Sequence, residues 1–251
     1  METTKAVILD NENDPQWAVA PGGTETTVRL AEKTLAQAAE KARIPVKEID
    51  YIIATGIGRE YLSFAHHELP EFQCLAKGID SAIPTTRTLL DLGARKSLAV
   101  KCSKGRTLKV ASSSKCASGT GTYLDMVSNL LNIDYDKMTE MSLKAKEDLT
   151  IQSTCAIFAE SEIISLVHDG VKADDIVWGV FRGISGRIYP HLLELGMEDD
   201  ITVVGGVAKS KAMIAALEQI TGHKMKVPEN PEIIGALGAA LIAREKGSEK
   251  T

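Results

Sequence analysis

An apolar stretch that runs directly into a glycine turn occurs three times in this chain, and this pattern restricts the fold more than any other feature. The turns lie at Thr55–Arg59, Asp91–Gly93 and Val204–Val207. Apolar residues recur at helical spacing elsewhere, for example over 24–41 and 209–219. Strands and helices that alternate in this way predict an α/β fold. The 251 residues leave room for two packed lobes of roughly 100 residues each.

The individual elements follow from the same patterns. We expect strands over 5–10, 49–54, 85–91 and 201–204, and a hairpin of 98–101 with 108–110 around a Lys104-Gly105 turn. We expect helices over 24–41, after Cys116, after Cys155, over 209–219 and over 233–244. The last of these helices is rich in small residues, so we expect it to pack closely against a neighbour.

Each glycine turn is a candidate for contact with a phosphate or a base. A backbone approaches such a group closely only where no Cβ intrudes, and the N-terminus of a helix adds amide donors and positive potential. One turn of this kind is explained by an ordinary strand–helix connection, whereas three in order favour a nucleotide site. Asp91 ends one of the strands, where a carboxylate can hold a water of a Mg²⁺ shell.

Cys116 and Cys155 each open a segment of helical character. Neither has a second cysteine at CxxC distance, so one chain offers two thiolates and two chains offer four. Four thiolates are what a [4Fe-4S] cluster bridging a dimer requires, and a helix start favours the thiolate form. The alternative for each cysteine is a small buried core residue. Gly119 and Gly121 make the stretch after Cys116 more open than helix packing requires.

Other candidate residues have simpler explanations. Cys74 and Cys102 lie near apolar segments without a glycine loop, which favours burial in the core. Residues 66–68, His-His-Glu, lack a third ligand at metal spacing, so we expect a solvated helix surface. Glu160 and Glu162 are either catalytic or acidic residues favoured at a helix start.

The charge and hydropathy patterns exclude several classes of partner. The formal net charge is −5 and no basic stripe compensates for it, which argues against nucleic acid. No apolar run approaches the roughly 18 residues that a membrane span needs, and no signal-peptide pattern is present. We therefore expect a cytoplasmic protein whose four cysteines are thiols or metal ligands rather than disulfides.

The motifs resemble those of the BadF/BadG/BcrA/BcrD-type ATPases, which activate 2-hydroxyacyl-CoA dehydratases and power ATP-dependent benzoyl-CoA reductases. Residues 115–125 (KCASGTGTYLD) are similar to the family's first cluster motif, and 155–165 (CAIFAESEIIS) look like its second. Residues 55–59, 74–78 and 205–208 fall in family order, so the resemblance covers nearly the whole chain.

This resemblance implies an actin/hexokinase/Hsp70-like fold with ATP and Mg²⁺ between two lobes and a [4Fe-4S] cluster shared by two subunits. The first lobe would comprise 1–88 plus 229–251, and the second 89–228. ATP turnover would drive a low-potential electron onto a cluster-containing reductase or dehydratase. A ferredoxin-like protein would donate the electron. The chain would form a homodimer, or a heterodimer with a paralogous ATPase subunit. The residues assigned on this basis are catalytic Asp91, cofactor-binding Gly93, Gly119, Gly121, Gly205 and Gly206, and the metal ligands Cys116 and Cys155.

Two departures from the family pattern favour the smaller, D-type subunit of benzoyl-CoA reductase as the match. The family opens with a strand and a Gly-rich phosphate loop, whereas residues 1–5 begin where that loop ends. We therefore expect either a first lobe truncated at its N-terminus or a start codon assigned too far downstream. The family's Asp-Ile-Gly-Gly-Gln-Asp is Asp-Leu-Gly-Ala-Arg-Lys at 91–96. These departures leave a hydrolysis-deficient scaffold beside a complete paralogue as an alternative. The third alternative, a small-metabolite kinase of the same superfold, rests on fold analogy alone and gives Cys116 and Cys155 no role.

Overall fold

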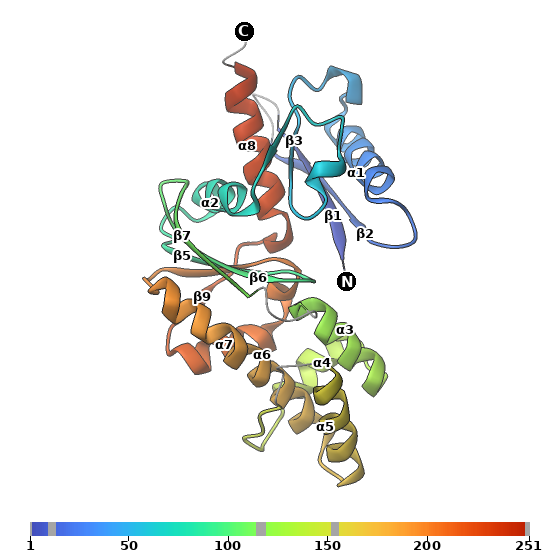
Figure 1. Ribbon diagram of the computed structural model, residues 1–251, viewed down its shortest axis with the longest axis vertical. Coiled ribbons are helices and arrows are strands. Elements are labelled where there is room, and N and C mark those ends of the chain that lie inside the picture. The colour runs from blue at the N-terminus through green and yellow to red at the C-terminus, as the bar shows by residue number, and fades with distance from the viewer. Residues whose placement is uncertain (1, 10–13, 114–118, 152–155, 249–251) are drawn as a thin grey trace. The chain divides into compact units, whose positions relative to one another are not determined.

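The computed structural model describes residues 2–9, 14–113, 119–151 and 156–248. The chain forms two compact units (Figure 1). Unit 1 comprises Met1–Thr86, Cys102–Leu108 and Pro228–Thr251, and unit 2 comprises Arg87–Lys101 and Lys109–Val227.

Unit 1 contains two separate pairs of strands. β1 (Thr3–Ile8) pairs antiparallel with β2 (Gln16–Pro21), and β3 (Ile53–Thr55) pairs parallel with β4 (His67–Leu69). The helices of this unit are α1 (Thr27–Ala42), α2 (Glu71–Ala82) and α8 (Ile234–Ser248), with short 3₁₀ turns at Val46–Glu48, Arg59–Tyr61 and Pro231–Ile233. His67 lies in strand β4, so the helix surface expected at 66–68 is wrong.

Helix α1 confirms the helix expected over 24–41. Thr26 caps its N-terminus, where the hydroxyl oxygen accepts a hydrogen bond from the Arg29 amide at 3.4 Å. Arg43 ends it in the left-handed conformation, and its amide donates to the Ala39 and Glu40 carbonyls. The buried face of α1, which includes Ala38 and Ala39, packs against β1 and β2.

Helices α2 and α8 cross at two glycines, as the small-residue composition of α8 predicted. A Cβ on Gly238 would lie 1.7 Å from the Cys74 carbonyl oxygen, and one on Gly78 would lie 2.1 Å from the Ile234 oxygen. Neither distance is physically possible, so only glycine allows these backbones to come this close. Cys74 is fully buried at this contact and Cys102 is buried in strand β6, which confirms the predicted burial of both thiols.

Unit 2 is built on one five-stranded sheet in the order β7-β6-β5-β8-β9. Its strands are β5 (Thr88–Leu92), β6 (Ser97–Ser103), β7 (Arg106–Ser113), β8 (Ile201–Val204) and β9 (Met225–Lys226). β5 runs antiparallel to β6 and parallel to β8. Positive φ at both Lys104 and Gly105 makes the two-residue turn that joins β6 to β7, so the predicted hairpin is confirmed.

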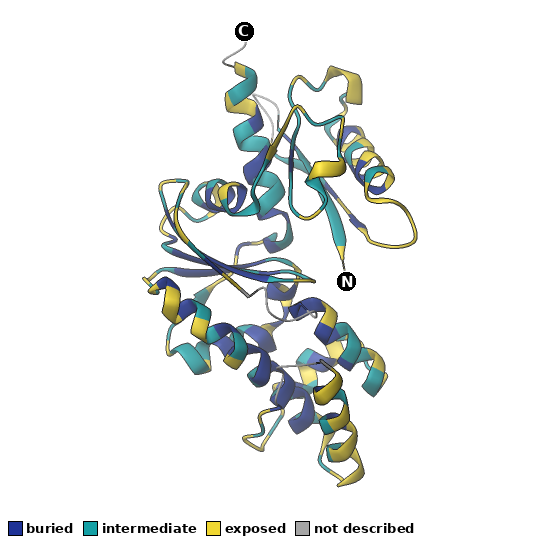
Figure 2. Ribbon diagram, in the orientation of Figure 1, coloured by how far each residue is buried: buried dark blue, intermediate teal, exposed yellow. Residues whose placement is uncertain are grey.

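Helices surround the core of unit 2. They are α3 (Thr120–Leu131), α4 (Tyr135–Ser142), α5 (Ala156–His168), α6 (Ala173–Leu195) and α7 (Lys211–Thr221), with a 3₁₀ turn at Gly206–Lys209. Phe181 and Ile184 of α6 are fully buried among residues from α3, α5, α7 and the sheet. Figure 2 shows α6 as largely buried and much of α5 as exposed.

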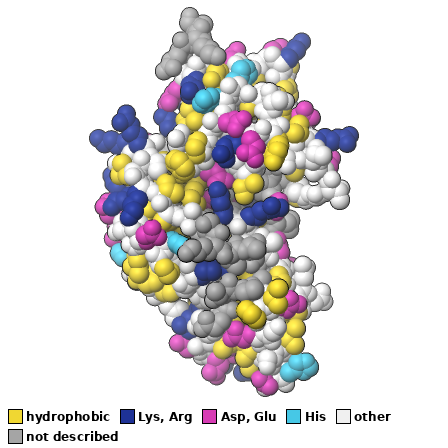
Figure 3. Space-filling model, viewed as in Figure 1, with side chains coloured by type: hydrophobic (Ala, Val, Ile, Leu, Met, Phe, Trp, Pro, Cys, Tyr) yellow, Lys and Arg dark blue, Asp and Glu magenta, His cyan; other side chains and the backbone are white. Residues whose placement is uncertain are grey.

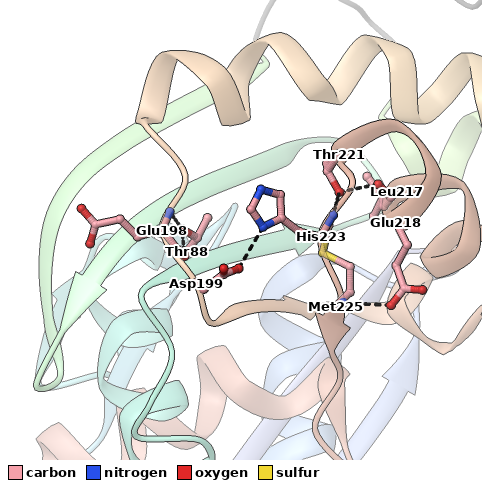
Figure 4. A network of polar contacts seen from close by, with 8 residues as sticks. All are labelled: Thr88, Glu198, Asp199, Leu217, Glu218, Thr221, His223 and Met225. Carbon is pink, nitrogen blue, oxygen red and sulfur yellow. Dashed lines mark hydrogen bonds and ion pairs between the residues drawn. The ribbon is translucent and has the colours of Figure 1, made fainter.

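A polar network holds the amino ends of the parallel strands (Figure 4). The Thr88 hydroxyl donates to the Glu198 carbonyl at 2.8 Å and accepts from the Glu198 amide at 2.9 Å. Asp199 Oδ1 lies 2.9 Å from Nδ1 of His223, and the Met225 amide donates to Glu218 at 2.9 Å. These bonds fix the segments that lead into β8 and β9, at the opposite end of these strands from the predicted site.

Candidate nucleotide and cluster site

The carboxyl ends of β5 and β8 bring Asp91 and Gly205 together. The two strands are parallel and Asp91 is the partner of Val204, so the turn after each strand begins at the same edge of the sheet. Gly205 has φ +87°, and a Cβ there would lie 2.5 Å from both Asp91 Oδ1 and the Leu92 carbonyl oxygen. Ligands in open α/β sheets bind outside the carboxyl ends of the strands, and the predicted catalytic carboxylate lies at such an edge.

The turn after β5 is closed by its own hydrogen bonds and by the start of α3. The Gly93 amide donates to the Lys96 carbonyl at 3.1 Å. The Gly121 amide donates to the Gly93 carbonyl at 3.1 Å, and the Thr122 amide donates to the Ala94 carbonyl at 3.0 Å. Two amides of the first turn of α3 are therefore already bound to the 93–96 turn.

Gly119 and Gly121 allow this contact. A Cβ on Gly119 would lie 2.0 Å from the carbonyl carbon of Arg95, and one on Gly121 would lie 2.9 Å from the Cα of Ala94. The backbone packing alone therefore explains glycine at both positions. Their predicted role toward a cofactor stays a prediction.

Gly206 differs from Gly205. It is exposed, and a Cβ there would meet nothing within 4 Å among the described residues. Packing therefore does not explain this glycine. A position with free space, next in the chain to the glycine that touches Asp91, fits the close approach of a nucleotide.

Cys116 and Cys155 lie outside the described residues. Helix α3 begins at Thr120 and α5 at Ala156, so both helices expected after the cysteines are confirmed. Within the ranges that the structure describes, no group of three or more His, Cys, Asp or Glu side chains is placed to hold a metal ion.

Sequence reasoning missed Tyr123 and Arg187, which the fold brings together between these two helices and α6. Tyr123 is fully buried, and Arg187 Cζ lies 5.7 Å from the centre of its ring. Burial raises the pKa of Tyr123 to about 12, with the Arg187 charge opposing this shift and the Glu162 charge adding to it. The only signal in the sequence was an aromatic residue directly after Gly-Thr-Gly-Thr, and nothing there indicates its neighbours.

Comparison with known proteins identifies the family. The model of the BadF/BadG/BcrA/BcrD ATPase family matches residues 2–243. The chain belongs to this family. It is 35% identical to the activator of lactoyl-CoA dehydratase of Anaerotignum propionicum over 99% of this chain and 96% of that protein. It is also 31% identical to the D-type subunit of the benzoyl-CoA reductase of Thauera aromatica, over 85% of this chain and 78% of that protein.

A solved structure confirms the fold predicted for this family member. The activator of the 2-hydroxyisocaproyl-CoA dehydratase from Clostridium difficile, with bound ADPNP, superimposes with a TM-score of 0.92 at 32% identity. The match covers 99% of this chain and 93% of that one. The fold is therefore the predicted actin/hexokinase/Hsp70-like fold. In the part of the chain that the structure describes, every helix is too short or too polar to span a membrane.

Proposed function

We propose that this protein is an ATP-binding subunit that bridges a [4Fe-4S] cluster with a second chain and drives low-potential electron transfer to a partner CoA-ester dehydratase or reductase. One observation supports the proposal most strongly: the turns that contain Asp91, Gly93, Gly205 and Gly206 lie at the same edge of the sheet. The chain that carries them belongs to this ATPase family. The relatives named as dehydratase activators and as the D-type reductase component support the choice of partner.

The nucleotide would be held at the carboxyl ends of β5 and β8. Asp91 would hold a water of the Mg²⁺ shell, which fits a half-buried carboxylate at this edge. Gly93 would face the phosphates, and Gly205 and Gly206 would face the adenosine. The free space at Gly206 supports this assignment, because a ligand can come close to the backbone there.

Cys116 and Cys155 would each give one thiolate to a cluster completed by the same residues of a second copy or of a paralogue. In the sequence each cysteine precedes the start of a helix, α3 at Thr120 and α5 at Ala156, and a helix start favours a thiolate and an anionic group. When bound, the cluster would supply one electron at low potential. A ferredoxin-like protein would be the donor.

Helix α5 presents a surface suited to the second chain. Phe158 and Ile157 are 74% and 70% exposed in the first turn after Cys155, and Ile164 and Val167 extend the exposed apolar face along the helix. In Figure 3 the hydrophobic side chains at the lower end of the face are interspersed with acidic ones, as on the rim of a protein interface. An exposed apolar surface of this kind marks a protein interface, which supports a dimer formed around the cysteine-bearing segments.

A second candidate function is nucleotide binding without independent hydrolysis, as a scaffold beside a complete paralogue. The turn at 93–96 favours it, because Ala94, Arg95 and Lys96 replace the family's Gly-Gln-Asp and the turn is bound to the first turn of α3. Phosphate release by the purified chain, alone and mixed with a paralogue, separates the two functions.

Calorimetric titration with ADPNP and Mg²⁺ tests the nucleotide site. Gly206→Ala adds a methyl group in free space, so we expect an unchanged fold and weaker nucleotide binding. Gly186→Ala is the matched control, since its Cβ would meet only Ile220 Cδ1 at 3.9 Å on a different surface of unit 2. Equal affinity in the wild type and both variants would contradict the placement of the nucleotide at Gly206.

Iron and acid-labile sulfide in anaerobically purified protein test the cluster. We expect about two irons per chain, the share of each subunit in a bridging [4Fe-4S] cluster. Cys116→Ala and Cys155→Ala should each lose the iron, whereas Cys102→Ala, at a buried thiol of the core, should keep it. Full iron in either of the first two variants would remove that cysteine from the ligand set.

A further inference from the structure

The two turns at the carboxyl edge of the sheet in unit 2 carry more positive than negative charge. Residues 91–96 contain Asp91, Arg95 and Lys96, and residues 204–210 contain Lys209 as their only charged side chain. Three cations therefore accompany one carboxylate, although the formal net charge of the whole chain is −5. Because the carboxyl ends of β5 and β8 lie side by side, both turns belong to the same edge. A nucleotide bound there would meet a local excess of positive charge.

Hydrogen bonds fix the backbone of the turn that carries two of these cations. The Gly93 amide donates to the Lys96 carbonyl at 3.1 Å, and the Ala94 carbonyl accepts from both the amide and the hydroxyl of Thr122, at 3.0 and 2.6 Å. Arg95 is exposed and Lys96 is partly exposed. Helix α3 therefore fixes the backbone positions from which these two long, charged side chains extend at the edge of the sheet.

This pair of cations changes the charge of the turn relative to the family pattern described above. Arg95 stands where that pattern has glutamine, which adds one positive charge, and Lys96 stands where it has aspartate, which adds two. The second carboxylate of the turn is lost as well. Magnesium sites commonly consist of one or two carboxylates together with the phosphates of the substrate, so this turn retains one candidate ligand, Asp91.

We propose that Arg95 and Lys96 bind the phosphate groups of the nucleotide directly, so that a nucleoside di- or triphosphate binds here with little dependence on Mg²⁺. This inference rests on the proposed function, because it concerns the same nucleotide site. Arginine forms paired hydrogen bonds to a phosphate, and lysine acts on it as a point charge. Together they offset the negative charge that a magnesium ion offsets elsewhere. Binding of this kind forms and breaks no covalent bond.

Calorimetric titration with ADPNP, once with Mg²⁺ and once with EDTA, tests the proposal on the full chain. In the wild type, removal of Mg²⁺ should weaken binding by less than about tenfold, because the two side chains already neutralise the phosphates. Arg95→Gln and Lys96→Gln should each weaken binding in EDTA by roughly three- to tenfold. Added salt should weaken binding less in these variants than in the wild type, because screening acts on the charge that they lack.

Lys224→Gln is the matched control for the loss of one positive charge. The Lys224 side chain is 92% exposed and lies directly before β9, at the amino end of the parallel strands and so opposite the candidate site. The four residues of β8 span roughly 10 Å, which exceeds the screening length of about 8 Å at physiological salt. We therefore expect Lys224→Gln to bind ADPNP as the wild type does, with and without Mg²⁺.

A double variant, Arg95→Gln with Lys96→Asp, restores the family's residues at both positions and makes the opposite prediction. It should bind ADPNP in the presence of Mg²⁺ and lose binding in EDTA, because it regains a carboxylate for the metal ion and lacks the cations. Urea unfolding of the same sample checks that it is folded. Damage to the fold would weaken binding in both conditions, whereas a change in the charge of the site weakens it only in EDTA.

The outcomes distinguish this inference from the function on which it rests. Wild-type protein that binds ADPNP only with Mg²⁺ would overturn the inference and leave the nucleotide site intact. Equal binding in EDTA by the wild type, Arg95→Gln and Lys96→Gln would also overturn it, since the cations would then be ordinary solvated turn residues. A wild type that binds no ADPNP in either condition would overturn the proposed nucleotide site, and this inference with it.

Discussion

Replacing Gly205 with alanine should destabilise unit 2, because the new methyl group has no room. A Cβ at this position would lie 2.5 Å from the Leu92 carbonyl oxygen and 2.8 Å from its carbonyl carbon. The Asp91 carboxylate, also at 2.5 Å, can rotate away, but the backbone of β5 cannot move without disturbing its pairing with β8. Gly205 also has φ +87°, a conformation that L-residues avoid.

The two costs can be combined. A non-glycine residue at positive φ costs roughly 1–2 kcal/mol, and overpacking a tight site typically costs about 1–3 kcal/mol. The free energy of unfolding should therefore fall by about 2–5 kcal/mol, a large part of the roughly 5–15 kcal/mol that stabilises a typical domain. Because the methyl group also displaces Asp91, nucleotide affinity should fall as well.

Urea unfolding followed by circular dichroism measures the first effect. Gly206→Ala is the internal comparison, since its Cβ lies in free space and its stability should change by less than about 0.5 kcal/mol. If Gly205→Ala unfolded at the same urea concentration as Gly206→Ala, the close packing of Gly205 against the end of β5 would be refuted.

Three further predictions concern stability. Gly119→Ala should fail to fold or unfold at much lower urea, because its Cβ would lie 2.0 Å from the Arg95 backbone; a wild-type unfolding midpoint would contradict the contact between α3 and the 93–96 turn. Gly238→Ala should likewise separate α8 from α2 and lower the melting temperature, which scanning calorimetry would show. Asp175 accepts hydrogen bonds from the Glu147 and Lys146 amides at 3.0 and 2.7 Å, and these bonds lower its pKa below the usual range of an aspartate. A lowered pKa stabilises the fold above the unfolded value, so Asp175→Asn should lower stability above about pH 4. The difference from the wild type should shrink as the pH falls further, and a pH-independent difference in urea midpoint would show that the carboxylate charge is not what matters.

The elements that sequence patterns predicted are those in which local signals and tertiary packing agree. Helix α1 has a capping threonine and an apolar face of sufficient length, and it begins within three residues of the predicted start. β8 is a run of four buried residues that leads into a glycine turn, and it was predicted over the same residues. The hairpin β6–β7 follows from a two-residue turn that ends in glycine.

The missed elements depend on contacts with other elements rather than on their own local sequence. Helix α6 is 23 residues long, but it contains Gly179, Gly183, Gly186 and Pro190, which are unfavourable within helices. Burial of its apolar residues in the core of unit 2 outweighs these local penalties. Strand β2 was missed because it is short and ends in proline, and its pairing with β1 is what defines it.

The candidate site shows the same division. The glycine turns at 91–93 and 204–207 were recognised because strand–glycine patterns are local, and the fold places them side by side. The sequence could not show that Gly205 is required by packing whereas Gly206 is not, because the difference lies in the neighbouring strand. Tyr123 was missed for a related reason, since its burial arises only when α3, α5 and α6 pack together, and so does the lack of a partner for its hydroxyl among the described residues.

Native mass spectrometry of the anaerobically purified protein would decide whether two chains share one cluster, because it counts chains and clusters in the same particle. We expect an assembly of two ATPase-family chains that carries one four-iron, four-sulfide cluster and separates into cluster-free chains when Cys116 or Cys155 is replaced by alanine. A single chain that carries a complete cluster by itself, or a stable two-chain assembly that never contains iron, would contradict the proposed function.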